Sequence, residues 1–357
     1  MLVAYASFIA PLSATAQEKG SADDLGVMSI SLKDVVKPTI GFQGALQGAG
    51  TPNQAGIGGF LPLSVGDNSL FFVDAQANVD FADYEGYSSI INTDVAGTTI
   101  STSSRLGYRW LNSDRSWMYG LNAGYDSRPM NTGGTDTGIN VSGTEKSAFF
   151  QQVAVNAEAV SNDWNFNAYA LVPVGDTEQD LNFFYEGGAL NTYGLDVGYF
   201  ITPNLNASVG YYYQSGDLGT VDGSGVLGRL AYEMTSGVTA GVNLSYDEAF
   251  DTRVSADIKV RFGGARTTAQ RKEVQQLPVI SALTSTPSNR IVRVHDDCGP
   301  DFAKSSVGGL TGGAVTGAVA GSFAAGAGAI PGAAFGALGG LFSGTAVGVV
   351  NCIYEAF

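Results

Sequence analysis

Residues Ser103–Arg128, SSRLGYRWLNSDRSWMYGLNAGYDSR, carry the clearest signal of the fold of this chain. On both sides of a polar turn at 112–115, apolar side chains occupy every second position, and most positions between them hold charge or glycine. A period of two with aromatic residues on one face indicates β-strands whose two faces meet different media. The pattern favours lipid against one face and a wet lumen against the other. The apolar positions are Leu106, Tyr108, Trp110, Trp117, Tyr119, Leu121, Ala123 and Tyr125.

The same alternation recurs over residues 39–262. With candidate strands near 39–48 and 55–65 it gives about twelve strands, an even number as in bacterial single-chain barrels. No segment between 17 and 300 has the roughly 18 unbroken apolar residues of a transmembrane helix. An open sheet would leave unpaired edges in lipid, so the strands must close. We therefore predict an all-β transmembrane barrel over this range, with a soluble Gly-rich β-sandwich as the alternative.

The connections between the predicted strands differ in length. Tight turns at 161–163 and 235–237 contrast with longer polar links at 128–147 and 175–187. Short periplasmic turns and long extracellular loops are typical of outer-membrane barrels. The sequence thus predicts the outer membrane as the location and its lipid as a partner.

Composition and motifs exclude several function classes. The net charge of −15 argues against nucleic acid as a partner, because phosphates would be repelled. We find no nucleophile–base constellation or phosphate-binding loop, so no enzyme activity and no cofactor are expected. The ligand-type residues at 295–298 (HDDC) are consecutive, a spacing that metal sites do not use.

Charges of both signs occupy the predicted lumen face. Paired across a narrow barrel they would make a plugged or structural interior. The alternative is a selectivity surface: residues 38–262 hold 24 acidic and 9 basic residues, so an open pore would favour cations. The predicted lumen charges are Asp74, Arg105, Arg109, Asp126, Glu158, Asp196, Arg229, Glu233, Asp257, Lys259 and Arg261.

Segments outside the barrel have other compositions. Residues 1–16 form a short apolar run ending in a small-x-small pattern, which predicts a signal peptide whose true start lies upstream; a buried N-terminal element is the alternative. The segment 17–38 is polar and mixed. Residues 263–304 are polar and rich in arginine, and they predict a linker with one helical piece around 268–276.

The segment 305–352 is uncharged over most of its length and dominated by Gly, Ala and Val. Two runs of glycine at four-residue spacing predict a glycine-zipper helical hairpin, with a break at 326–331; a flexible tail is the alternative. Cys298 and Cys352 bracket the hairpin and are candidates for a disulfide worth about 4 kcal/mol, unless they stay unpaired. The zipper glycines are Gly309, Gly313, Gly317, Gly321, Gly332, Gly336, Gly340, Gly344 and Gly348.

Several motifs resemble one known family. Phe60–Leu63 (FLPL), Asn68–Asp74 (NSLFFVD), Asp163–Tyr169 (DWNFNAY) and Val254–Phe262 (VSADIKVRF), with parts of the opening stretch, are similar to the inverse autotransporter β-domain of the intimin and invasin adhesins. The resemblance covers roughly residues 39–262. It implies that the final strand, ending at Phe262, is recognised by the barrel-assembly machinery.

In that family a linker threads the pore and exported immunoglobulin-like domains follow. Here 95 residues follow Phe262 (357 minus 262) and none predicts such a domain, so host-cell adhesion is not implied. The first hypothesis is a barrel that anchors or exports its own C-terminal segment. The alternatives are a small cation-preferring channel, or display of a membrane-active glycine-zipper peptide.

Overall fold

The computed structural model describes most of the chain between residues 31 and 298. The described residues are 31–84, 88–132, 146–182, 185–216, 218, 222–235, 237–263 and 277–298, and the backbone of 135–136 and 139–140.

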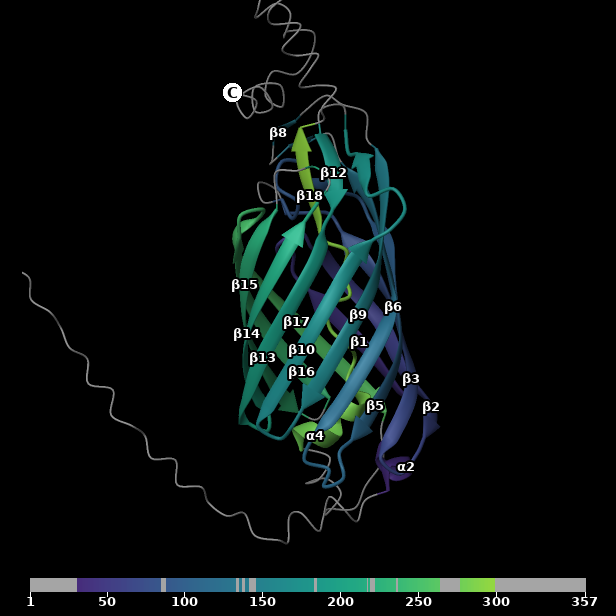
Figure 1. Ribbon diagram of the computed structural model, residues 1–357. Coiled ribbons are helices and arrows are strands. Elements are labelled where there is room, and N and C mark those ends of the chain that lie inside the picture. Colours follow the sequence, from purple (N-terminus) through teal and green to yellow (C-terminus); the bar gives the residue numbers. More distant parts are fainter. Residues whose placement is uncertain are drawn as a thin grey trace, which may run out of the picture.

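A closed antiparallel β-barrel forms the body of the molecule (Figure 1). Its sheet holds thirteen strands, and twelve of them form the ring, because β4 (Val95–Ala96) is a two-residue addition beside β6. Pairing of β1 with β17 and of β6 with β9 closes the ring. The ring strands are β1 (Thr39–Ala45), β2 (Asn53–Val65), β3 (Ser69–Phe81), β5 (Thr99–Leu111), β6 (Met118–Thr132), β9 (Ser147–Val160), β10 (Trp164–Pro173), β13 (Asn191–Thr202), β14 (Leu205–Ser215), β15 (Gly223–Thr235), β16 (Val238–Asp247) and β17 (Asp251–Gly263).

The two ends of the barrel differ in their connections. The turns at one end, which we call the short-turn end, are 66–68, 112–117, 161–163, 203–204 and 236–237. The first barrel residue, Thr39, pairs with the last, Gly263, at this same end. The other end, the loop end, carries the longer connections and the small strands β4, β7 (Thr135–Asp136) and β8 (Ile139–Asn140). This is the predicted asymmetry.

Exposure along the strands confirms the predicted alternation. On β5, Leu106 is 49% exposed and Tyr108 45%, whereas Arg105 and Arg109 are each 1% exposed. The outer face thus presents apolar side chains to the surroundings, and the inner face encloses the charged ones, as lipid outside and water inside require. Among the described residues no helix is long and apolar enough to cross a bilayer.

Aromatic side chains gather in two bands on the outer face. Near the short-turn end, rings of neighbouring strands follow one another at centroid distances of 4.9–6.3 Å. Such bands are the girdles that barrels place at the two membrane interfaces. The short-turn band contains Tyr108, Trp110, Trp117, Tyr119, Trp164, Phe166 and Tyr199, and the loop-end band contains Phe81, Tyr125, Phe149, Tyr193, Tyr213 and Tyr246.

Short elements cover both ends of the barrel. Helix α2 (Leu32–Val35), helix α4 (Pro278–Ser281) and the 3-10 turn η1 (Ala282–Thr284) lie at the short-turn end (Figure 1). At the loop end, β11 (Glu178–Asp180), β12 (Tyr185–Ala189) and β18 (Val294–Cys298) form a three-stranded sheet. Residues 277–298, which follow the last barrel strand in the sequence, therefore contribute to the cover at each end.

The predicted barrel limits, 39–262, agree with the observed 39–263 within one residue. The linker predicted at 263–304 is not solvated throughout, because its residues 277–298 are built into the barrel. Outside the described residues lie the signal peptide at 1–16, the helical piece at 268–276 and the glycine zipper at 305–352. The side chains of Cys298 and Cys352 lie outside them too, so the disulfide stays a prediction.

Candidate functional site: a threaded lumen

Residues 277–298, which we call the threaded segment, run the length of the lumen. The segment starts with α4 and η1 at the short-turn end and finishes as β18 at the loop end (Figure 1). There β18 pairs antiparallel with β12, from Val294 opposite Ala189 to Cys298 opposite Tyr185. The chain thus leaves the barrel wall at one end and emerges at the other.

An apolar cluster seals the lumen where the segment begins. Val279 and Leu283 are fully buried among side chains from α2 and from the inner faces of β2, β3 and β5. Burying a side chain of this size contributes about 1.5–3 kcal/mol, so the cluster fixes the start of the segment firmly. Its other members are Leu32, Val35, Val36, Phe60, Leu70, Phe72, Leu111, Met118, Ile280 and Ala282.

Two arginines of β5 hold the backbone of the threaded segment. Arg109 donates to the carbonyl oxygens of Leu283 (3.1 Å) and Ser285 (2.7 Å), pairs with Glu158 at 2.9 Å, and stacks on Phe72. Four residues earlier on the same strand, Arg105 donates to the carbonyl oxygen of Asn289 at 3.0 Å. The planar guanidinium suits this task because it carries five N–H donors in a fixed geometry.

Arg105 is itself fixed by a buried carboxylate. It makes two bonds to Asp126 of β6, at 2.7 and 2.8 Å, and both side chains are at most 1% exposed. Further along β6, Arg128 donates to the carbonyl oxygen of Val292 at 3.0 Å and to that of Gly50. The wall made of β3, β5 and β6, which we call the grip wall, therefore contacts the segment over most of its length.

Two arginines of the segment itself bind acidic side chains of the barrel wall. Arg290 pairs with Asp74 of β3 and donates to the hydroxyl of Ser103 at 2.7 Å. Arg293 pairs with Asp247 of β16 at 2.9 Å. Its guanidinium also lies over the ring of Tyr212, 4.6 Å from the centroid, which adds a cation–π contact.

A latch at the loop end holds β18. The buried carboxylate of Asp296 accepts hydrogen bonds from the backbone N–H groups of Asn92 (3.0 Å) and Thr93. Asp83 supports the loop that presents them, because its carboxylate accepts from the backbone N–H of Ser89 at 2.9 Å. Burial raises the pKa of Asp83 and lowers that of His295, the residue before Asp296, to about 4.

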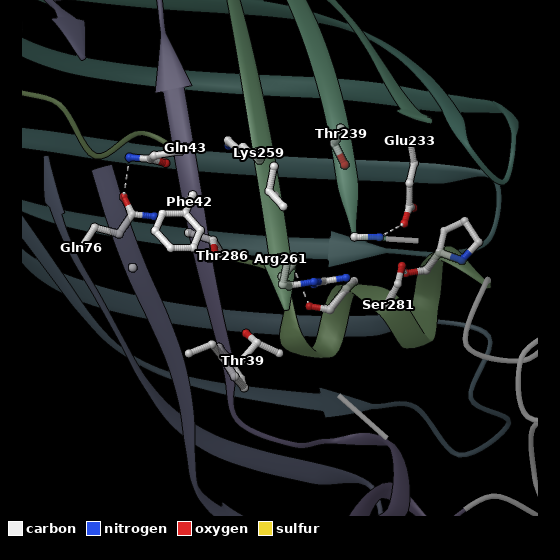
Figure 2. Close-up of a pocket in the computed structure, with 18 of the residues that line it drawn as sticks. Thr39, Phe42, Gln43, Gln76, Glu233, Thr239, Lys259, Arg261, Ser281 and Thr286 are labelled. Atoms are coloured by element: carbon white, nitrogen blue, oxygen red, sulfur yellow. Dashed lines mark hydrogen bonds between the residues drawn. The ribbon is translucent and has the colours of Figure 1, made fainter. Parts of the chain in front are cut away.

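The opposite wall, made of β15, β16 and β17 and called here the cavity wall, leaves space beside the segment. A cavity of about 370 Å³ lies between this wall, β1 and the segment residues Ser281, Ser285 and Thr286 (Figure 2). Arg229 and Asp257 of the wall pair at 2.5 and 3.0 Å and keep partial exposure. The grip wall thus packs against the threaded segment, whereas the cavity wall leaves open space beside it.

The structure brings most of the predicted lumen charges into these two walls. Glu233 accepts from the backbone N–H of Gly237 at 2.9 Å, and Arg261 donates to the carbonyl oxygen of Thr284 at 3.3 Å. Asp196, on β13, accepts from the side-chain amide of Asn167 at 3.4 Å. Phe262 points outward, 51% exposed, with its ring edge on Phe42.

Sequence reasoning did not place Arg128, Arg290 and Arg293 in the lumen. A signal was present, because the predicted linker combines these last two arginines with apolar Val279 and Ile280, which a solvated linker does not need. Opposite inward charges do pair, at Arg105–Asp126, Arg109–Glu158 and Arg229–Asp257, but these pairs join adjacent or next-but-one strands of the ring and do not cross the barrel as predicted.

Comparison with solved structures shows a similar overall fold. No family model and no curated protein matches the chain. A solved structure from work on the in-meso crystallization of membrane proteins matches with a TM-score of 0.53 and 12% identity, over 73% of this chain and 99% of that one. The COG4313 outer membrane channel from Pseudomonas putida F1 (TM-score 0.42, 12% identity, 64% and 96% covered) and the KdgM porin (0.35, 9%, 63% and 99%) are more distant.

Proposed function

We propose that this protein is an outer-membrane barrel that anchors its own C-terminal segment and carries it to the external face. The observation that supports the proposal is the path of residues 277–298, which begin beside the short turns and finish beside the long loops. In outer-membrane barrels short turns face the periplasm and long loops face outward. Residues after 298 would then begin on the outer side.

The contacts along the path favour anchoring over free passage. Four ion pairs in or beside the lumen have side chains at most 12% exposed, and two of them belong to the segment itself. Removing one partner of a buried pair costs about 3–5 kcal/mol, because it leaves the other charge uncompensated. The segment is therefore held as a fixed part of the barrel, and it also fills the space that a channel would need.

The lipid and the assembly machinery are the partners in this proposal. The outer face supplies an apolar surface between two aromatic bands, which suits a bilayer. Phe262, near the end of the closing strand and exposed on the outer face, is accessible to the barrel-assembly machinery. The proposal includes no chemical reaction.

The test is the side of the membrane on which the C-terminus lies. We would append an epitope tag after Phe357 of the full chain and stain intact Gram-negative cells with antibody. Two control chains carry the same tag in the β14–β15 connection at the loop end, or between Pro203 and Asn204 at the short-turn end.

We expect the C-terminal tag to stain on intact cells like the β14–β15 control. The tag between Pro203 and Asn204 should stain only after the outer membrane is disrupted. If the C-terminal tag instead behaves like the short-turn control, export is excluded and the segment is a plug whose tail returns to the periplasm.

A further inference from the structure

The cavity beside the threaded segment lies on the side of the lumen where the packing is loose. It measures about 370 Å³, within the range of small-molecule pockets, and both apolar and polar side chains line it. Hydroxyl groups come from both sides: Thr39 and Thr239 from the barrel, and Ser281 and Thr286 from the segment (Figure 2). The segment therefore completes the cavity.

The charges around the cavity do not cancel. Arg229 is matched by Asp257 in a two-bond ion pair. Arg261 is matched by the nearby charge of Glu233. Lys259, between them on β17, makes no hydrogen bond or ion pair with any residue that the structure describes, and it is surrounded by protein on all sides while exposed to the cavity itself. One positive charge is therefore left over.

A surplus cation here runs against the composition of the chain. The protein carries a net charge of −15, and residues 38–262 hold 24 acidic and 9 basic residues. The open part of the lumen nevertheless presents an unmatched ammonium with three N–H donors. Two residues along the same strand, Arg261 donates one hydrogen bond to the carbonyl oxygen of Thr284 at 3.3 Å. Its other N–H groups remain to share an anion with Lys259.

We propose that this cavity binds a small hydroxylated anion, with its carboxylate or phosphate at Lys259 and Arg261. Charge-assisted hydrogen bonds from these two cations would hold the anionic head. Glu233 repels a second negative charge and accepts hydrogen bonds from hydroxyl groups, so it selects a polar body with one anionic end. Because Ser281 and Thr286 line the cavity, the site exists only when the segment is threaded.

The site is separate from the proposed carriage of the tail, and its test uses a different measurement. Full-length protein in detergent micelles, in chloride-free buffer of low ionic strength, would be titrated calorimetrically with gluconate and with inorganic phosphate. Sorbitol, which has the hydroxyl groups of gluconate without its charge, is the ligand control. The variants are Lys259→Gln, Lys259→Arg and, as a matched loss of one lysine at an exposed ion pair, Lys146→Gln.

We expect saturable binding of gluconate or phosphate and none of sorbitol. Lys259→Gln should weaken the binding at least tenfold, while Lys259→Arg and Lys146→Gln bind like the unchanged protein. Heat-modifiable gel mobility checks that each variant is a closed barrel. The proposal is overturned if neither anion binds saturably, if sorbitol binds as well, or if a folded Lys259→Gln variant retains full affinity. Which of the two anions binds more tightly distinguishes a carboxylate head from a phosphate head.

Discussion

The grip wall and the cavity wall face the same lumen and both carry charged side chains on alternate residues, but the two sets of charges have different partners. Arg105 and Arg109 on the grip wall are 1% exposed and reach the backbone of the threaded segment. On the cavity wall, Arg229 pairs within the wall, and the Lys259 side chain has no hydrogen bond or ion pair with a described residue. Asp247 and Arg261 of this wall do bind the segment, the first through an ion pair and the second through a hydrogen bond. Similar strand patterns thus serve as a clamp on one side and line a cavity on the other.

The role of an inward-facing charge in a barrel therefore depends on what fills the lumen. A filled lumen excludes water, so a polar group that has no protein partner there lowers the stability of the fold. An open lumen leaves water as the partner and makes ion pairs weaker. Four experiments test the contrast between the walls.

The largest effect is expected from the double variant Arg290→Ala/Arg293→Ala. It leaves Asp74 and Asp247 without their cations, at about 3–5 kcal/mol for each buried pair. We expect the segment to detach from β3 of the grip wall and from β16 of the cavity wall. Planar-bilayer recordings should then show larger conductance than the unchanged protein, and protease should cleave within 277–298.

Its control is the double variant Arg115→Ala/Lys146→Ala, which removes two cations at exposed sites. That protein should keep the conductance and protease resistance of the unchanged chain. Equal behaviour of the two double variants would show that the ion pairs do not hold the segment.

The next effect is that of Arg109→Ala on the grip wall. The change breaks the pair with Glu158, the bonds to two carbonyl oxygens and the stack on Phe72. We expect the free energy of unfolding, measured in urea with lipid vesicles, to fall by about 3–5 kcal/mol. Arg109→Lys should lose nearly as much, since an ammonium cannot make the forked contacts. A loss below 1 kcal/mol would contradict the clamp.

A third effect concerns the loop-end latch and pH. Burial lowers the pKa of His295 from 6.5 to about 4, so the folded protein holds this side chain neutral while the unfolded chain protonates it at higher pH. The stability that this gives is complete above pH 6.5 and is lost as the pH falls toward 4. At about 1.4 kcal/mol per pKa unit the loss is at most about 3.5 kcal/mol.

Hydrogen exchange of the β12–β18 amides between pH 7 and 4 measures this loss. In His295→Gln the same exchange should depend less on pH, because the titrating group is gone. The carboxylates titrate in both proteins, so the difference between them isolates the histidine. Identical profiles would exclude His295 as the cause.

The smallest effect is expected on the cavity wall. Arg229→Ala removes a pair whose arginine side chain keeps 26% exposure and lines the cavity, so water that fills the vacated space can solvate Asp257. We expect the free energy of unfolding to fall by no more than about 1 kcal/mol. A loss as large as that of Arg109→Ala would mean that the two walls do not differ in how they are packed.

Much of the barrel could be predicted from the sequence because its strands obey a local rule. Alternation along Ser103–Arg128 predicts which side chains face outward, and the exposure of Leu106 and Tyr108 confirms it. The strand count follows from repeating the same test along the chain. The turn residues 112–117 were less certain: Trp117 continues the apolar alternation but lies just before β6.

The candidate site could be predicted only in part. The lumen face of Arg105 and Asp126 follows from alternation, but their contact does not, because it joins side chains 21 positions apart on strands whose register pairs Arg105 with Gly124. The position of Arg290 against Asp74 spans 216 positions and lies in a segment without strand periodicity. No local pattern carries that information.

A closed barrel with an apolar outside thus follows from local sequence patterns, because the residues of each strand distinguish its two faces and lipid requires closure. What fills the barrel does not follow from such patterns. The threaded segment finds its place through contacts with many strands at once: apolar packing at the short-turn end, arginines along the grip wall, and the pairing of β18 with β12. Long-range contacts of this kind depend on the three-dimensional position of the whole wall. The same positions also leave Lys259 facing an open cavity.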